Sequence, residues 1–314
     1  MLLRVNAIHN ETLVIKSFEL VDPEGLDLPP FTAGSHVDVT LPDGQVRQYS
    51  LCNPPADRQR YVLGVLHEPA GRSGSRQMHE RVTEGDVLQV SMPRNHFPLD
   101  ETAARHVLIA GGIGITPLMA MVARLRVTNA AVVLHYCTRD EDNTAFRALL
   151  GAPELGAQVQ FHHDGGVPGR GLDIAALLAT VETKTHVYCC GPAGLMAAVK
   201  VASADWPRRQ IHFEHFAAPI EAAPAGVFGS FEVEIASSGA VYPVPPERSI
   251  LSVLLSEGIA IDSSCEAGVC GTCMTRYLSG TPDHRDFVLS DAEQRDHVMV
   301  CVSRAKSARL VLDL

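Results

Sequence analysis

The sequence lacks runs of basic residues, long apolar segments and a charged-then-apolar start. Its 26 Lys and Arg are outnumbered by 36 Asp and Glu, which gives a net charge of −10 over 314 residues. That balance argues against a role dominated by contacts with nucleic-acid phosphates. The most apolar stretch, 107–123, contains three glycines and Pro117 and is shorter than the roughly 20 residues that span a membrane. Because a signal-peptide pattern is also lacking, we expect a cytoplasmic protein, monomeric by default, that binds neither nucleic acid nor membrane.

Internal repeats are absent too, and the one low-complexity tract is a Pro/Ala/Gly-rich segment at 217–229. At about 100–200 residues per domain, the length predicts two or three globular units. The residue pattern changes twice along the chain. We therefore predict a first domain at 1–100, a second at 101–220, a linker at 221–229 and a third domain at 230–314.

The three regions have different secondary-structure patterns. In the first, short β-rich runs separated by Pro, Gly and Asp turns predict an antiparallel barrel; the runs are 36–41, 45–51, 61–66 and 87–91. In the second, alternating strands and helices predict a parallel sheet with helices on its faces; the strands are 107–110, 131–136, 159–162 and 186–190, and the helices 117–126 and 195–204. The third begins with a predicted hairpin at 230–236 and 241–244, followed by a helix at 249–257 with Ser249 as its N-cap.

Four of the eight cysteines have a spacing that indicates a metal centre. Cys265, Cys270 and Cys273 form C-x4-C-x2-C, and Cys301 follows 28 positions later, which is the plant-type 2Fe-2S pattern. Glycines 268 and 271 would let the loop turn its backbone amides toward the cluster sulfurs. The alternative is a four-cysteine zinc site, which usually pairs two short knuckles. Cysteines 52, 137 and 189 lie in apolar contexts and are read as small buried residues.

Two glycine-rich turns in the second region each connect a strand to a helix. The first contains Gly111, Gly112 and Gly114, with Pro117 in the following first helical turn. Such a turn lets a pyrophosphate approach backbone amides, although tight packing alone can demand glycine and the pattern departs from G-x-G-x-x-G. The second turn, 190–194, follows another strand. Two such turns at neighbouring strand ends would build one crevice.

The first region carries two motifs suited to a flavin phosphate and ring. On a strand, Arg47 and Tyr49 point to one face and Ser50 to the other. A cation beside an aromatic ring suits a phosphate and a planar cofactor, although alone this tetrapeptide is an ordinary surface strand. The loop 71–75 precedes a helical run at 76–82 and offers a further phosphate cradle.

In this order, the motifs resemble the reductase components of Rieske-type oxygenase systems, of the phthalate dioxygenase reductase and vanillate demethylase reductase kind. The resemblance covers essentially the whole chain. Its motifs are R-x-Y-S (47–50), G-R-x-G-S (71–75), G-G-x-G-x-T-P (111–117), C-G-P (190–192) and the C-terminal ferredoxin motif. It implies a β-barrel that binds FMN, an α/β domain that binds NAD and a β-grasp-like α+β ferredoxin domain. FMN is favoured over FAD because relatives that carry FAD usually have the ferredoxin domain first.

The resemblance also implies roles for individual residues. Arg47 and Ser75 would hold the FMN phosphate, helped by Arg72, Ser73 and Gly74 of the same loop, although Ser73 stands where glycine is frequent. Tyr49 and Ser50 would contact the isoalloxazine, and Phe216 would shield it unless it is a buried strand end. The nucleotide would be bound by Gly111, Gly112, Gly114, Thr116, Pro117, Cys190, Gly191 and Pro192.

The catalytic positions implied are Thr116, Cys190 and Glu214, close to the site of hydride transfer. Preference for NADH rests on the acids at 140–142, where Asp140 would disfavour a 2′-phosphate, although Arg139 opposes that inference. The pair His162-His163 with Asp164 is explained as a strand end near the nucleotide rather than as a metal site.

The expected function is NADH-dependent reduction through FMN and the 2Fe-2S cluster of a separate Rieske-type aromatic-ring dioxygenase or O-demethylase. The chain lacks the Cys/His pairs of a Rieske centre and a non-heme iron triad, so the electrons must leave to another protein. The third region, with 12 acids and 7 bases over 229–314, would meet a basic patch on that partner. The alternatives are a reductase for another hydroxylase class and a redox-sensing module without turnover.

Overall fold

The computed structural model describes residues 1–69, 74–153, 158–167, 169–182, 184–216 and 229–314. The chain divides into two compact units, Met1–Glu214 and His215–Leu314, which are described separately. The predicted linker at 221–229 falls outside the described residues except for Gly229. None of the helices in the described part of the chain has both the length and the apolar character that a membrane span needs.

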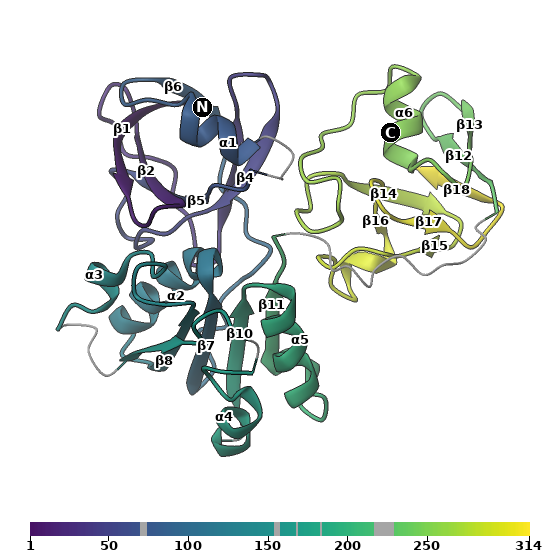
Figure 1. Ribbon diagram of the computed structural model, residues 1–314. Helices are drawn as coiled ribbons and strands as arrows, with labels where there is room; N and C mark the ends of the chain where they lie inside the picture. Colours follow the sequence, from purple (N-terminus) through teal and green to yellow (C-terminus); the bar gives the residue numbers. More distant parts are fainter. Residues whose placement is uncertain (70–73, 154–157, 168, 183, 217–228) are drawn as a thin grey trace. The chain divides into compact units, whose positions relative to one another are not determined.

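The first part of unit 1 is a six-stranded antiparallel sheet (Figure 1). Its strands, in the order β4-β3-β6-β1-β2-β5, are β1 (Leu2–Asn10), β2 (Ile15–Val21), β3 (His36–Thr40), β4 (Val46–Ser50), β5 (Tyr61–Leu66) and β6 (Val87–Val90). A bridge between Leu51 and Leu63 joins the two edges, so the sheet closes as the predicted barrel. Helix α1 (Gly74–Glu80) is the next described element after β5.

The second part of unit 1 is a five-stranded parallel sheet. In the order β11-β10-β7-β8-β9 its members are β7 (Arg105–Gly111), β8 (Ala131–Thr138), β9 (Val159–His163), β10 (Thr185–Cys190) and β11 (Ile211–Glu214). The helices are η1 (Gly112–Gly114), α2 (Ile115–Val127), α3 (Arg147–Leu150), α4 (Ile174–Thr180), α5 (Ala193–Ala202) and η3 (Arg208–Gln210).

The strand order places a topological switch point between β7 and β10. From β7 the chain runs outward to β8 and β9, then returns to β10 on the other side of β7. In open parallel sheets, ligands bind beyond the carboxyl ends of the strands at this point. Both glycine-rich turns follow these two strands. The topology therefore puts both predicted nucleotide turns at this switch point.

The barrel and the parallel sheet share one hydrophobic core. Buried side chains of the barrel, of α2 and of β7 and β8 form one continuous cluster. A separate cluster covers the other face of the sheet, beneath α4 and α5. Because the shared cluster crosses from one domain to the other, burial of apolar surface holds the two domains together.

Unit 2 is built on a second five-stranded sheet, in the order β13-β12-β18-β14-β16. Its elements are β12 (Phe231–Ile235), β13 (Val241–Val244), α6 (Ile250–Ser256), β14 (Met274–Ser279), β15 (Pro282–Asp283), η5 (Glu293–Arg295), β16 (His297–Met299), β17 (Arg304–Ala305) and β18 (Arg309–Leu312). The predicted hairpin and helix are confirmed, and Ser249 caps α6 by accepting from the Ser252 amide at 3.1 Å.

Candidate functional site

On the barrel, Arg47 lies against the first residue of α1. A Cβ on Gly74 would be 2.5 Å from Arg47 Nε, so the Arg47 side chain as placed occupies the space that a larger residue at 74 would need. Ser75 follows, and its hydroxyl accepts a hydrogen bond from the Glu68 amide at 3.0 Å. The structure thus brings together two of the segments predicted to hold a phosphate. Two further predicted residues, Arg72 and Ser73, lie outside the described residues.

The alternation expected on β4 is present. Arg47 pairs with Val39 and Tyr49 with Val37, whereas Ser50 pairs with His36 on the other face. The Tyr49 ring is half-buried, and burial raises the pKa of its hydroxyl. A cation and a neutral aromatic side chain therefore share one side of this strand.

The two glycine turns pack against each other at the switch point. A Cβ on Gly114 would be 2.2 Å from the Cys190 carbonyl oxygen, and one on Gly111 would be 2.5 Å from Pro192 Cδ. Gly191 in turn approaches Gly111, since its Cβ would be 2.9 Å from the Gly111 Cα. Gly112 differs, because it has φ +52° and nothing lies within 4 Å of the position that a Cβ would take. Close packing thus explains glycine at 111, 114 and 191, and backbone conformation explains it at 112.

Thr116 lies where the nucleotide domain meets the barrel. Its hydroxyl donates to the Ile113 carbonyl at 3.0 Å within the first turn of α2. Its methyl faces β5, where a Cβ on Gly64 would be 2.6 Å from Thr116 Cγ2. The sequence reasoning missed Gly64, although a lone glycine inside a strand pattern signals close backbone approach.

Three predicted residues from separate motifs meet at the end of the sheet. Cys190 and Glu214 are paired in register at the ends of β10 and β11. The Glu214 carboxyl is hydrogen-bonded to the Ser50 side chain of the barrel. In the described structure, Glu214 Oε2 is shielded from solvent and has no hydrogen-bond partner. Burial raises the pKa of Glu214 from 4.5 to about 8, although the hydrogen bond with Ser50 acts in the opposite direction. The pKa of Cys190 is also raised, mainly by burial and then by the nearby Glu214 carboxyl.

The buried carboxyl predicts a pH dependence of stability. The pKa of Glu214 is about 8 in the folded protein and 4.5 ordinarily. The protonated carboxyl therefore makes its full contribution to the free energy of unfolding below pH 4.5, and this contribution is lost as pH rises through 8. We expect Glu214→Gln to remove this loss, which has a slope of at most about 1.4 kcal/mol per pH unit. Urea unfolding across this range measures it. Glu182→Gln, at an exposed carboxylate paired with Arg105, is the control, and an unchanged slope in Glu214→Gln would contradict the assignment.

The remaining predicted ligands are not all brought to this site. Asp140 is exposed in the loop after β8, where its Oδ1 accepts from the Asn143 amide at 2.9 Å and side chain at 2.7 Å. Those hydrogen bonds, the side-chain one first, lower the pKa of Asp140. Phe216 belongs to unit 2 and is 47% exposed, so its role at the flavin stays a prediction.

The histidines near β9 have partners within the sheet. His162 Nε2 lies 3.0 Å from His135 Nδ1, and the two rings stack. His163 Nδ1 is 3.0 Å from the Thr138 hydroxyl. Contacts between β8 and β9 therefore explain the positions of both histidine side chains.

In unit 2 the four cysteines of the spacing motif lie close together as two pairs. The Cys265 thiol contacts Cys270, and the Cys301 thiol contacts Cys273. In the first pair, the contact with Cys265 lowers the pKa of Cys270. Three of the four side chains are buried, and Cys265 is half-buried.

The loop between the cysteines turns its amides toward sulfur, as the sequence predicts. The Ala267 amide donates to Cys265 Sγ at 3.4 Å, and the amides of Val269 and Gly268 face Cys265 and Cys301. Positive φ values at Gly268 (+71°) and Gly271 (+76°) make this path possible. Among the described residues, no group of three or more Cys, His, Asp or Glu side chains is placed so that it could hold a single metal ion. Two pairs of thiols supply what a 2Fe-2S cluster requires, two thiolates for each iron.

Comparisons with known proteins agree with this architecture. The 2Fe-2S iron-sulfur cluster binding domain family matches residues 233–306. The tert-butanol monooxygenase / tert-amyl alcohol desaturase reductase subunit of Aquincola tertiaricarbonis is 46% identical over 99% of this chain and 95% of its own. The phthalate dioxygenase reductase of Burkholderia cepacia is 46% identical over 96% of this chain and 93% of its own. A solved phthalate dioxygenase reductase structure covers 100% of this chain and 98% of that one at 44% identity, with a TM-score of 0.75.

The barrel, the parallel sheet and the C-terminal 2Fe-2S domain define a multidomain oxidoreductase of the kind that serves oxygenase systems. The chain belongs to the family of phthalate dioxygenase reductase and vanillate O-demethylase reductase. The predictions of fold class, family and a 2Fe-2S ferredoxin domain are confirmed, and the expected flavin and pyridine nucleotide fit this fold. The roles assigned to individual residues remain predictions.

Proposed function

We propose that this chain is a cytoplasmic reductase that passes electrons from NADH through FMN and its 2Fe-2S cluster to a separate Rieske-type oxygenase acting on aromatic compounds. The observation that carries the proposal is the meeting of Ser50, Cys190 and Glu214. Ser50 comes from the barrel, whereas Cys190 and Glu214 end neighbouring strands of the parallel sheet. A flavin on the barrel and a nucleotide at the switch point would therefore meet in one crevice.

The chain's own residues have binding and positioning tasks in this proposal. Arg47 would neutralise the flavin phosphate beside Gly74, where the glycine leaves space for its guanidinium. Tyr49 would pack against the ring system. The turn at 111–114 would bind the pyrophosphate through backbone amides. When bound, the cofactors supply the hydride and electron chemistry, so no side chain is required as a general acid or base.

The protonated Glu214 carboxyl would complete the pocket without adding charge. At neutral pH a group with a pKa of about 8 is mostly neutral, so it can donate a hydrogen bond next to a developing charge. The Cys190 thiol also stays protonated, because burial raises its pKa. This end of the sheet would thus present neutral groups to the nicotinamide, and neutral groups are less costly to shield from water than charged ones.

The acidic character of the ferredoxin domain supports transfer to another protein. Residues 229–314 contain 12 acids against 7 bases, and complementary charge mainly raises the rate of encounter. An oxygenase partner with a basic docking patch would match this surface. Association should then slow as ionic strength rises.

An anaerobic visible spectrum followed by NADH titration tests the proposal. We expect flavin and 2Fe-2S bands that bleach stoichiometrically, with FMN released on extraction. Turnover with a Rieske-type oxygenase should then exceed turnover with other acceptors. A colourless or zinc-containing protein would refute the cofactor assignment, and cluster reduction too slow for catalysis would favour a redox sensor.

A second acceptor class is supported by one relative. The tert-butanol monooxygenase / tert-amyl alcohol desaturase reductase subunit is named for alcohol substrates. Exchanging oxygenase components in the turnover assay separates this candidate from the aromatic one. Higher rates with an alcohol-oxidising component would favour it.

A further inference from the structure

The segment between β8 and α3 contains a residue in an unusual conformation. Phe146 precedes α3 with φ +57° and ψ 20°, in the left-handed region. A bulky aromatic residue is rare there, and such a strained backbone conformation persists only where the surrounding structure enforces it. Phe146 is only 6% exposed. Its surroundings must therefore explain why the strain persists.

Contacts to both domains hold this segment in place. The Tyr136 hydroxyl accepts from the Ala145 amide and donates to the Gly112 carbonyl at 3.1 Å, inside the first glycine turn. The Phe146 ring lies against β5, where a Cβ on Gly64 would be 3.4 Å from two ring carbons. The same Gly64 faces the Thr116 methyl. The segment thus touches both the predicted nucleotide turn and the barrel wall behind it.

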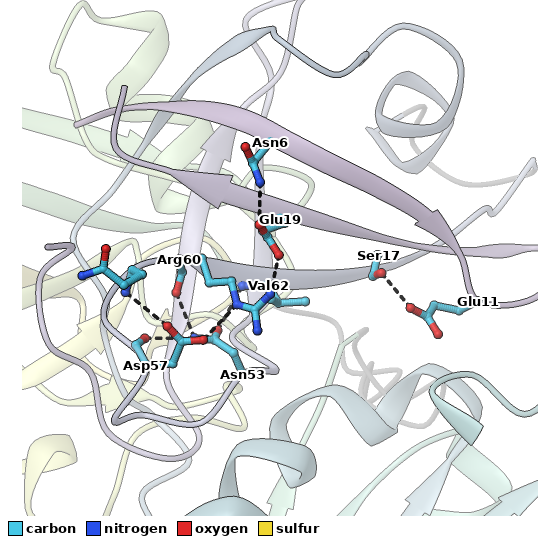
Figure 2. Close-up of polar contacts among 9 residues, drawn as sticks. Asn6, Glu11, Ser17, Glu19, Asn53, Asp57, Arg60 and Val62 are labelled. Carbon is cyan, nitrogen blue, oxygen red and sulfur yellow. Dashed lines mark hydrogen bonds and ion pairs between the residues drawn. The ribbon is translucent and has the colours of Figure 1, made fainter. Parts of the chain in front are cut away.

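The polar contact that joins Phe146 to the barrel is made by Glu11. Glu11 follows β1, and its Oε2 accepts from the Phe146 amide at 3.1 Å. Its Oε1 accepts from the Ser17 hydroxyl on β2 at 2.7 Å, the contact drawn at one side of Figure 2. The carboxylate is therefore fixed by the barrel and directed at the nucleotide domain. The hydrogen bond to Glu11 is made with Phe146 in this left-handed conformation.

We propose that the contact between Glu11 and Phe146 is a positioning element that sets the distance between the flavin and nicotinamide rings. The inference rests on the proposed function, in which the barrel holds one ring and the nucleotide domain the other. Hydride transfer needs reacting atoms about 3–3.5 Å apart, and a shift of about 1 Å can cost 100-fold in rate. The apolar contacts between the domains are non-directional, whereas a hydrogen bond fixes orientation.

A neighbouring glutamate provides a matched control. Glu19, on the same hairpin as Glu11, accepts from Asn6 at 2.7 Å and Arg60 at 2.5 Å, and this network lies within the barrel (Figure 2). Glu19→Ala therefore removes two hydrogen bonds, as Glu11→Ala does, without touching the nucleotide domain. In Glu11→Gln, the amide oxygen can still accept from Phe146, and the amide group can donate to the Ser17 hydroxyl.

The experiment is anaerobic stopped-flow reduction of the bound flavin by NADH and by NADH deuterated at the transferred position. We expect Glu11→Ala to slow reduction at saturating NADH by about 10- to 100-fold, with a raised isotope effect and an NADH Kd within about threefold. Glu11→Gln should restore most of the rate, and Glu19→Ala should retain all of it. Flavin content and unfolding midpoints of the variants establish that they fold.

The outcomes separate this inference from the proposed function. A wild-type flavin that NADH does not reduce would refute the function. A wild-type flavin that is reduced, with Glu11→Ala as fast as Glu19→Ala, would overturn the positioning role alone. An equal loss in both alanine variants would also overturn it, because it would show only general destabilisation. If Glu11→Ala does not fold, Glu11→Asp takes its place, because a carboxylate that is one methylene shorter should not reach the Phe146 amide now 3.1 Å from Glu11 Oε2; the same slowing and raised isotope effect are expected.

Discussion

Replacing Cys301 by serine is expected to abolish the iron-sulfur centre while leaving flavin reduction intact. Cys301 is buried and its thiol contacts Cys273, so it would be the fourth ligand and would complete one of the two thiol pairs. Serine offers a harder oxygen ligand that suits iron-sulfur clusters poorly. Loss of a residue that only hydrogen-bonds to a metal ligand already weakens metal binding by about 10–100-fold. Because Cys301 would be a ligand itself, we expect the rate of electron transfer to an external one-electron acceptor to fall by more than about 100-fold.

Iron content, the visible spectrum and flavin bleaching by NADH measure this prediction. Cys137→Ser is the control, because Cys137 is a half-buried thiol in β8 of the other unit. It should keep the full iron content. A Cys301→Ser protein with wild-type 2Fe-2S absorption would show that another residue completes the cluster. Loss of NADH-driven flavin bleaching would instead show that the cluster is needed for the first half of the reaction.

Features with a local signal were predicted closely. Strands β5 and β13 have the predicted bounds, and the N-cap of α6 is Ser249 as expected. These elements have strong alternation or an unambiguous capping residue. The C-x4-C-x2-C spacing was equally informative, because three of the four cysteines are separated by only a few residues, whereas Cys301 follows 28 positions after Cys273. The glycines at 111 and 114 were also identified, although the structure shows packing as their main requirement.

Features that depend on distant contacts left little trace in the sequence. Strands β1 and β2 were not predicted, and their pairing is interrupted by a bulge between Val5 and Ala7, which breaks the alternation. The contact between Glu11 and Phe146 joins residues 135 positions apart. Nothing in either local sequence indicates the partner, and left-handed backbone is not expected at phenylalanine. Asp140 is a different case, because its carboxylate accepts from the Asn143 amide three residues away, and its role in the preference for NADH stays a prediction.

Gly114→Ala is expected to disrupt the crevice by sterics alone. Gly114 has φ −64° and ψ −2°, which alanine adopts freely. Its Cβ, however, would lie 2.2 Å from the carbonyl oxygen and 2.4 Å from the carbonyl carbon of Cys190. These are backbone atoms at the end of β10, so relief requires the two turns to separate. Overpacking of this kind costs about 1–3 kcal/mol, and we expect NADH to bind more weakly as well.

Gly194→Ala provides the matched comparison. Gly194 lies in the first turn of α5, and a Cβ there meets nothing within 4 Å. Because alanine lowers the entropy of the unfolded chain, this variant should be more stable by about 0.4–1 kcal/mol. Thermal unfolding and NADH titration of both variants measure the difference. If Gly114→Ala matched Gly194→Ala in stability and NADH affinity, the contact between the turns would not hold the crevice together, and glycine at 114 would have to be explained by the ligand.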